Sequence, residues 1–286
     1  MAKQNECKSM EELTSLMLRI SEASPVYRRI AAYIEQEYMQ VIFMTAENLA
    51  EVLGISQGSV SKFCIAMGYR GYSDFLRSLQ RLVSRDFSAP RRYHYTAASQ
   101  HHTEDVIAKE TLNIRSLKEI TALPEYEKLV ECVAGKQELV LLSARMSATL
   151  LPYTKYILDK LRDGVFLVTP GSDWDLVSLH HHPETTGIIA VGLPRYPRVL
   201  TEKMAELKKA GFYIHAVTDS RFSPLCAHAD NVVLIPTTVA SIFDIDSTPI
   251  MFLNLLVSDA ARKMPGLEER LAKIEQLEKE ENAYIG

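Results

Sequence analysis

The stretch LAEVLGISQGSVSKF (residues 49–63) contains two short helical patterns that a single glycine separates. Leu49 and Leu53 have the spacing of one buried helix face, and Thr45 stands at the N-cap position before them. Gly54 predicts a left-handed end to this first helix. Two helices joined by so short a turn have the form of a helix-turn-helix, although a tight hairpin inside a helical bundle has the same spacing.

The second helix is predicted to begin after Ser56 and to close at Gly68. Its buried face follows the i, i+3, i+4, i+7 pattern and consists of Val60, Phe63, Cys64 and Met67. The outward face carries short polar groups and one cation, which suit contact with bases in a DNA major groove. These predicted base contacts are Gln57, Ser59, Ser61 and Lys62. Phosphate contacts are predicted for Ser56, Arg70 and Tyr72.

The charge is distributed unevenly along the 286 residues, whose net value is −4. Residues 54–92 hold seven basic side chains against two acidic ones, whereas residues 86–286 carry a net charge of −5. A basic stretch on an otherwise acidic chain is typical of a module that binds a polyanion. The predicted partner is double-stranded operator DNA.

The composition changes along the chain and predicts two domains. Residues 10–85 read as helix throughout, and residues 1–85 form the predicted helix-turn-helix domain. Residues 86–102 are polar and aperiodic, which predicts a linker. Residues 103–286 are predicted to begin with a helix and to continue as an α/β domain.

Five short apolar runs in this second part are predicted to be buried strands, at residues 138–143, 164–169, 187–192, 212–218 and 231–236. Helical patterns alternate with them. Apolar strands alternating with helices indicate a doubly wound parallel sheet with both faces covered. The expected fold class is thus α + α/β, an all-helical domain followed by a parallel-sheet domain.

Several function classes are disfavoured by composition. No run of 18 apolar residues appears and the N-terminus lacks a signal pattern, so a cytoplasmic protein without a membrane span is expected. The four cysteines are far apart and predict neither a disulfide framework nor a zinc site. The three histidines at 180–182 are interpreted as a solvated loop, not a metal site. No cofactor is predicted.

The segment MTAENLAEVLGISQGSVSKFCIAMGYRGYSDFLRSL (residues 44–79) resembles the helix-turn-helix domain of the RpiR family of bacterial transcription regulators. The resemblance includes a glycine–aromatic tail, formed here by Gly68, Tyr69, Gly71, Tyr72 and Phe75. Lys62 stands where the family usually has arginine, so the charge is kept but bidentate geometry is lost.

The resemblance implies a C-terminal SIS domain, a doubly wound fold that binds phosphorylated sugars in this family. VTDSRFSPLCAHADNVVLIP (residues 217–236) is similar to a family segment. Two ligand loops depart from the family pattern. The first is usually Gly–x–Gly–x–Ser and is SARMS here, with Ser143 and Arg145 in place of glycines and Ser147 retained. The second is usually Ser–x–Ser–Gly–x–Thr–x–Glu and reads GLPRYPRV (residues 192–199).

Three arginines on these loops, Arg145, Arg195 and Arg198, are predicted to bind a small anionic effector such as a sugar phosphate. The other effector-site candidates are Ser143, Ser147, Tyr196, Thr218, Asp219 and Ser220. The alternative interpretation is that the arginines form structural ion pairs and that no ligand binds.

A stripe of Leu267, Leu271, Ile274 and Leu277 near the C-terminus favours a subunit interface, and a homodimer or homotetramer is expected. The prediction is a transcription regulator and not an enzyme. A sugar-phosphate isomerase is the main alternative, but Val199 occupies the position of the family's glutamate. A ligand-binding adaptor without DNA binding is the third interpretation.

Overall fold

The computed structural model describes residues 7, 9–42, 44–84, 102–221, 223–238 and 243–284. The chain divides into two compact units, Met1–Leu112 with Thr238–Ile245, and Asn113–Thr237 with Asp246–Gly286. This division falls inside helix α7 (His102–Ile120). The predicted linker, residues 86–102, lies outside the described residues except for His102, which begins α7.

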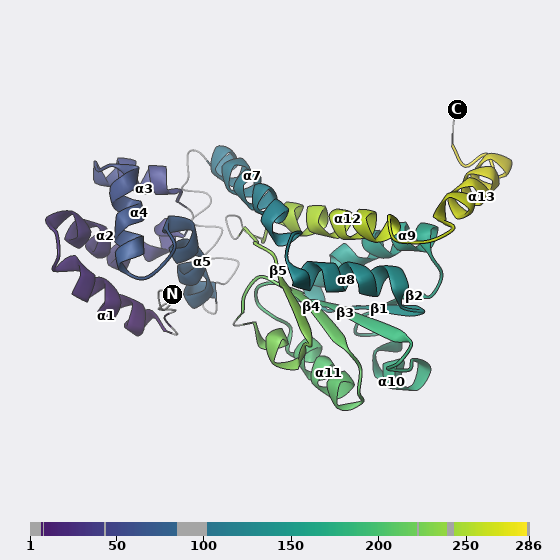
Figure 1. Cartoon of the computed structure of the whole chain (residues 1–286). Coiled ribbons are helices and arrows are strands. Elements are labelled where there is room, and N and C mark those ends of the chain that lie inside the picture. Colours follow the sequence, from purple (N-terminus) through teal and green to yellow (C-terminus); the bar gives the residue numbers. More distant parts are fainter. Residues whose placement is uncertain are drawn as a thin grey trace. The chain divides into compact units, whose positions relative to one another are not determined.

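The first unit is helical between residues 9 and 84 (Figure 1). Its helices are α1 (Met10–Ser21), α2 (Pro25–Val41), α3 (Ala46–Leu53), α4 (Gln57–Ala66) and α5 (Tyr72–Ser84), followed by the start of α7. They bury one continuous core in which Phe63 and Phe75 are fully enclosed. The edge of the Tyr27 ring packs on Phe63 with ring centroids 5.4 Å apart, so α2 and α4 are held together by an aromatic pair.

Local capping sets the helix-turn-helix boundaries, and the sequence predictions for them are confirmed. The Thr45 hydroxyl accepts a hydrogen bond from the Asn48 N–H at 3.1 Å and caps α3. Gly54 ends α3 with φ +60°, a left-handed conformation that suits glycine. Ser56 caps α4, and Gly68 follows that helix with φ +94°. Val60, Phe63, Cys64 and Met67 are all buried, as their spacing predicts.

The second unit contains one parallel sheet with the strand order β2-β1-β3-β4-β5. The strands are β1 (Glu138–Ser143), β2 (Val165–Val168), β3 (Thr186–Val191), β4 (Ile214–Thr218) and β5 (Asn231–Leu234). The helices are α8 (Pro124–Gly135), α9 (Leu151–Leu161), α10 (Val177–His180), α11 (Arg198–Lys209), α12 (Ser247–Ala261) and α13 (Leu267–Glu280). The short 3-10 helices are η1 (Arg145–Leu150), η2 (Asp173–Leu176) and η3 (Pro224–His228). All five predicted strands are confirmed.

Helices cover both faces of this sheet (Figure 1). Leu139 and Leu141 of β1 belong to the core beneath α8, α9 and α12, whereas Val140 and Leu142 belong to the core that contains α11. This alternation is the two-residue period of a strand buried on both sides. The chain order reverses direction between β1 and β3, and doubly wound folds bind ligands beyond the carboxyl ends of the strands at such a point.

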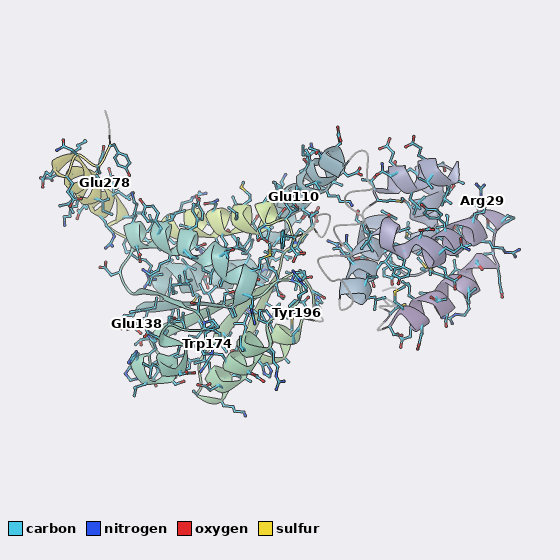
Figure 2. All side chains as sticks on the ribbon, turned by 180° about the vertical axis from the view of Figure 1, so that it is seen from behind. Arg29, Glu110, Glu138, Trp174, Tyr196 and Glu278 are labelled. Atoms are coloured by element: carbon cyan, nitrogen blue, oxygen red, sulfur yellow. The ribbon has the colours of Figure 1, made fainter. Side chains whose placement is uncertain are left out.

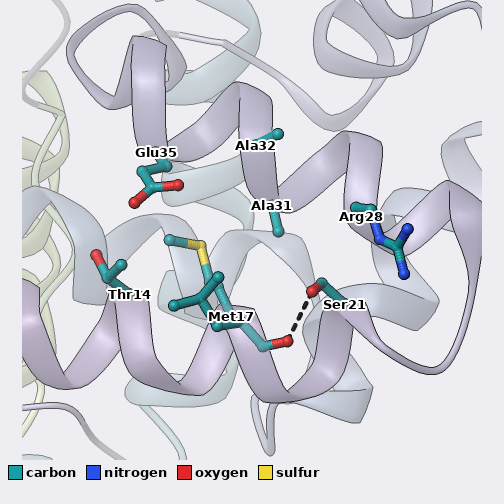
Figure 3. Close-up of a pocket in the computed structure, with 8 residues that line it drawn as sticks. Thr14, Met17, Ser21, Arg28, Ala31, Ala32 and Glu35 are labelled. Atoms are coloured by element: carbon teal, nitrogen blue, oxygen red, sulfur yellow. Dashed lines mark hydrogen bonds between the residues drawn. The ribbon is translucent and has the colours of Figure 1, made fainter.

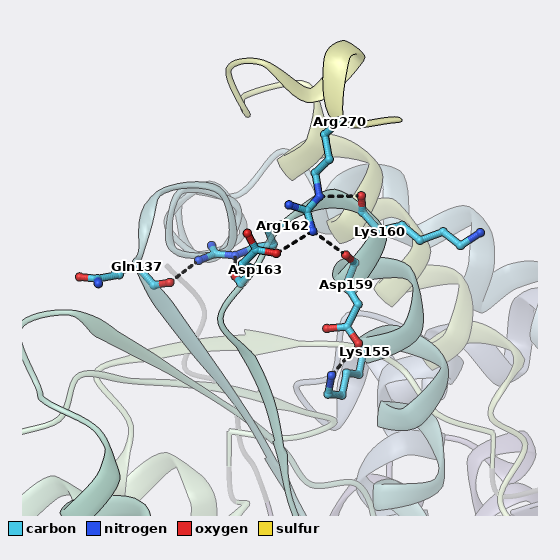
Figure 4. A network of polar contacts seen from close by, with 7 residues as sticks. All are labelled: Gln137, Lys155, Asp159, Lys160, Arg162, Asp163 and Arg270. Carbon is cyan, nitrogen blue, oxygen red and sulfur yellow. Dashed lines mark hydrogen bonds and ion pairs between the residues drawn. The ribbon is translucent and has the colours of Figure 1, made fainter. Parts of the chain in front are cut away.

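Polar contacts tie α13 to the end of α9 (Figure 4). The Arg270 guanidinium donates to the carbonyl oxygens of Lys160 at 3.0 Å and Asp159 at 2.9 Å, and pairs with the Asp163 carboxylate at 2.8 Å. No described residue of α13 is buried, and Leu271 and Leu277 stay 41% and 56% exposed. Leu271 and Leu277 of the apolar stripe are therefore not buried against their own unit.

The interpretation of residues 180–182 as a solvated loop is wrong for His181. This side chain is 5% exposed, and its Nδ1 is hydrogen-bonded to Glu138 Oε2 at 2.8 Å. Its ring packs against Phe166 with centroids 4.7 Å apart. The hydrogen bond from His181 lowers the pKa of the Glu138 carboxyl. The pair fixes the start of β1, at the opposite end of the sheet from the strand ends where ligands are expected.

In the part of the chain that the structure describes, no helix is both long and apolar enough to cross a membrane.

Candidate functional site

The outward face of α4 combines exposure with hydrogen-bonding groups. Gln57 and Lys62 are exposed and Ser61 is half-buried, and Lys62 lies on the side of the helix opposite Val60. Lys62 makes no ion pair with any described residue. A 10-residue helix is about 15 Å long, which fits a major groove. The arrangement presents a cation and polar groups to solvent.

Ser56 and Ser59 are hydrogen-bonded to each other at the start of α4. The Ser56 hydroxyl accepts a hydrogen bond from the Ser59 N–H at 3.2 Å, and the two hydroxyl oxygens are 2.9 Å apart. These contacts satisfy orphan donors of the first helical turn. Both residues therefore shape the N-terminus of α4, where backbone amides favour an anion.

Tyr72 does not lie on the surface, and its assignment as a phosphate contact is wrong. The side chain is 6% exposed, and its hydroxyl donates to the carbonyl oxygens of Met44 at 3.1 Å and Val41 at 3.3 Å. Burial raises the pKa of this hydroxyl. The aromatic tail of the motif builds the core, and Tyr72 joins α5 to the segment before α3.

Arg70 does lie on the surface, with its side chain 73% exposed. Its guanidinium pairs with Asp74 at 3.4 Å, and Arg77 approaches the same carboxylate at 3.5 Å. Burial alone favours the protonated acid, but hydrogen bonds and charge from Arg70 and charge from Arg77 lower the pKa of Asp74. Asp74 thereby gathers two cations at the start of α5, close in sequence to α4.

The effector-site candidates of the second unit gather at the carboxyl ends of three neighbouring strands. Ser143 of β1 is in register with Val191 of β3, which is in register with Val217 of β4. The loops beyond these residues therefore leave the sheet side by side. Hydrogen bonds join them: the Leu193 N–H donates to Ser147 Oγ at 3.2 Å, and the Tyr196 hydroxyl donates to Asp219 Oδ1 at 2.7 Å.

Two hydroxyls of the predicted site face the protein instead of a ligand, which corrects their assignment. Ser143 is fully buried and donates to the Val191 carbonyl at 2.7 Å. Thr218 is fully buried and donates to the Gly192 carbonyl at 2.7 Å. Both hydrogen bonds join the carboxyl ends of neighbouring strands. Ser220 is buried as well, with 2% exposure.

Arg145 and Arg195 have left-handed backbone conformations, with φ +58° and φ +65°. Such conformations are costly for a residue with a side chain and suit glycine. Both arginines stand at positions where the resembling loops have glycine, so this chain keeps the glycine backbone but replaces the residue. Both side chains are exposed. Strain of this kind is commonly retained at functional sites.

The loop that carries Arg195 is restrained on both sides. Pro194 and Pro197 fix their own φ angles and lack N–H donors, and Tyr196 is held by Asp219. Figure 2 places Tyr196 at the opposite end of the sheet from Glu138. Arg198 is the first residue of α11, 88% exposed, and pairs with Glu202 at 2.6 Å.

A small hollow between α1 and α2 of the first unit is lined in part by Met17, Ala31, Arg28 and Glu35 (Figure 3). Its volume of about 70 Å³ accommodates a few water molecules, not a sugar phosphate. Ser21 at its edge donates to the Leu18 carbonyl at 2.6 Å. The hollow is not a candidate effector site.

The first unit matches a known family. Residues 10–86 match the model described as the helix-turn-helix domain of the rpiR family. Residues 10–86 form an RpiR-family helix-turn-helix domain. The matched region contains all of α1 to α5, including the α3–turn–α4 pair.

Solved structures are similar to this chain in fold. The sugar isomerase domain of an RpiR transcription factor from Sphaerobacter thermophilus is 23% identical, with a TM-score of 0.55, and the alignment covers 63% of this chain and 99% of that one. NanR of Vibrio vulnificus, solved in complex with ManNAc-6P, is 18% identical, with a TM-score of 0.51 and coverage of 92% and 98%. The second unit therefore has the SIS fold. No curated protein matches the sequence.

Proposed function

We propose that this protein is a transcription regulator that binds operator DNA through α4 and changes its DNA affinity when a small anion binds at the carboxyl ends of β1, β3 and β4. The RpiR-family match over residues 10–86 supports the first half. The observation that carries the second half is the left-handed backbone of Arg145 and Arg195.

The argument from these two arginines is energetic. Glycine adopts a left-handed conformation at little steric cost, whereas arginine pays about 1–2 kcal/mol at each position. A chain that places arginine there loses stability and gains a guanidinium group. A guanidinium binds carboxylate or phosphate through two parallel hydrogen bonds, which compensates for amide donors that Pro194 and Pro197 lack. The strain therefore favours ligand binding over a merely structural role.

The site and the similar solved structures support two chemical classes of effector. Arg145 and Arg195 are exposed, and their guanidinium groups are two of the cationic groups on the loops at this edge. NanR, which shares the fold, is solved with ManNAc-6P, so sugar phosphates are the first class to test. Organic acids are the second, because an arginine fork accepts carboxylate equally well.

A two-fold dimer connects the effector to the operator in this proposal. The effector stabilises one relative arrangement of the subunits, and the spacing of the two α4 helices changes with it. The exposed Leu271 and Leu277 of α13 supply an apolar surface for the subunit contact. A homodimer is the smallest assembly that meets the requirement.

An isomerase reaction is not supported by the residues at this edge. Aldose–ketose isomerisation requires a carboxylate or histidine that moves a proton next to a carbonyl. Val199 replaces the glutamate of the family motif, and Asp219 is engaged by the Tyr196 hydroxyl.

The test of effector binding is thermal unfolding of the full chain against a panel of sugar phosphates, phosphorylated polyols and organic acids. A true effector at about 100 times its Kd stabilises the folded state by roughly 2.7 kcal/mol. Arg195→Ala is expected to abolish the shift. A shift of equal size in Arg195→Ala places the ligand elsewhere, and no shift with any compound rejects these classes as effectors.

A further inference from the structure

Gly58, in the first turn of α4, is a glycine that its own domain does not require. It has no left-handed φ, and a Cβ added there meets only Ser56 Oγ, at an ordinary contact distance of 3.7 Å. Two other glycines, Gly54 and Gly192, have an internal reason. Gly54 has φ +60°, and a Cβ on Gly192 lies 2.5 Å from a Leu225 methyl group. Only Gly58 of these three is free of constraint from its own fold.

Glycine at such a position lowers stability. Replacing glycine with alanine where the backbone is already helical stabilises a protein, because the unfolded chain has less freedom to lose. Gly135 of α8 has the same freedom, but Gly58 lies exposed on α4, the helix for which DNA binding is proposed, and a disfavoured residue at that place points to a constraint from outside the chain. Glycine is the residue used where another molecule approaches the backbone closely.

Gly58 lies on the outward face of α4. Gly58, Ser61, Lys62 and Ile65 follow the i, i+3, i+4, i+7 spacing of one face, opposite the buried Val60, Phe63 and Cys64. We call these four residues the α4 stripe. It extends about 10 Å along the helix, the rise of roughly three base pairs.

Ile65 is the large apolar residue of the α4 stripe, and its side chain is 56% exposed. In the major groove the apolar group that distinguishes one base from the others is the thymine methyl. An isoleucine beside a lysine on a groove-facing helix matches that chemistry: Lys62 reaches phosphate or guanine, and Ile65 contacts a methyl.

We propose that the α4 stripe is the surface that reads the operator, with Gly58 at the closest approach of the DNA and Ile65 against a thymine methyl. The proposal rests on the DNA binding proposed above and assigns the specificity residues within it. It adds Gly58 and Ile65 to the predicted contacts and leaves the Ser59 hydroxyl bonded to the capping Ser56 hydroxyl.

The test of Gly58 compares stability with affinity in the full chain. The probe is the tightest-binding duplex that the wild-type protein selects from a random library. Gly58→Ala is expected to raise the Tm of the helical unit by about 2–8 °C and to weaken binding at least tenfold. Gly135→Ala is the matched control, because Gly135 also has open space and no left-handed φ but lies in α8 of the other unit. It is expected to leave binding unchanged.

The test of Ile65 uses duplexes in which one thymine at a time is replaced by uracil, which removes only the methyl group. One replacement is expected to weaken wild-type binding about fourfold and to leave the affinity of Ile65→Ala unchanged. Leu18→Ala, at an equally exposed position on α1, is the control and keeps the wild-type response to uracil.

The outcomes separate the two proposals. If the wild-type protein selects no duplex, DNA binding itself is rejected. If it selects a duplex but Gly58→Ala binds that duplex as tightly as the wild type, the assignment of Gly58 is overturned. If Ile65→Ala remains as sensitive to uracil as the wild type, the thymine contact belongs to another residue.

Discussion

At the scale of single residues, the backbone of the two loop arginines is the most informative feature of the molecule. Arg145 and Arg195 hold left-handed conformations that glycine adopts more cheaply. Stability and ligand binding therefore favour different residues at the same positions. The stability cost of each arginine can therefore be measured without knowledge of the ligand.

Arg195→Gly is predicted to be more stable than Arg195→Ala by about 1 kcal/mol, because alanine keeps the left-handed strain and glycine removes it. Urea unfolding of the second unit measures the difference. Arg198, whose φ is not positive at the start of α11, is the control. There the order reverses, since glycine lowers helix stability relative to alanine. The same order at both positions would show that Arg195 is not strained.

Lys62→Ala is predicted to weaken binding to every duplex and to lower the slope of log K against log salt by about 1, because one phosphate contact is lost. Fluorescence anisotropy at several salt concentrations measures the slope. Lys128→Ala, an exposed lysine on α8, serves as the control and leaves the slope unchanged. A base-specific contact by Lys62 instead gives a loss that depends on sequence.

At the scale of helices and strands, the sequence predicted the architecture because the signals are local. Thr45, Gly54 and Ser56 define the α3–turn–α4 boundaries through contacts within three or four residues. The five strands follow from apolar runs that are buried on both faces. Neither prediction requires knowledge of distant parts of the chain.

The hydrogen-bond partners of polar side chains were predicted less well, because these partners lie on segments far away in the sequence. The Tyr72 hydroxyl bonds to Val41 and Met44, and the Ser143 hydroxyl bonds to a neighbouring strand. The His181 imidazole is hydrogen-bonded to Glu138, 43 positions earlier in the chain. A hydroxyl or imidazole in a family motif looks the same in the sequence whether it meets a ligand or the backbone.

His215, a buried histidine of β4, gives the stability of the second unit a defined pH dependence. His215 is 4% exposed, and burial lowers its pKa to about 4, with Lys136 and Lys128 acting in the same direction and Asp230 opposing. The Asn231 side-chain amide lies 3.0 Å from His215 Nδ1, where it donates to the neutral ring, and also donates to the Glu125 carbonyl. Protonation of Nδ1 removes that acceptor.

The stability of the second unit is predicted to fall as the pH drops from about 6.5 to about 4. The unfolded chain takes up a proton at the ordinary histidine pKa while the folded chain does not, which costs at most about 3 kcal/mol. Above pH 6.5 the contribution is fully present. Chemical unfolding between pH 4 and pH 8 measures it, and in His215→Gln this part of the pH dependence disappears. An identical pH profile in wild type and variant would contradict the assignment.

At the scale of the whole molecule, the proposed regulator requires a subunit contact that sets the spacing of two recognition helices. Polar contacts from Arg270 hold α13 on α9, while Leu271 and Leu277 remain exposed. An exposed apolar stripe on a firmly anchored helix is suited to pairing with a second copy of itself.

The double substitution Leu271→Glu with Leu277→Glu is predicted to reduce the molecular mass in solution to that of the monomer and to weaken operator binding more than tenfold, because one half-site contact is lost. Light scattering and anisotropy measure the two effects. Leu179→Glu, on the 72% exposed Leu179 of α10, is the control. A double variant that keeps both mass and affinity would move the interface away from α13.

The central claim is that an anion at the arginine loops controls DNA binding. The most direct test is the Kd of the full chain for its selected duplex, with and without each compound of the panel, in wild type and in Arg195→Gly. This variant keeps the loop conformation and removes only the guanidinium. The account predicts that at least one anion changes the wild-type Kd fivefold or more and leaves that of Arg195→Gly unchanged. A Kd that no anion alters, or an equal response in Arg195→Gly, would contradict it.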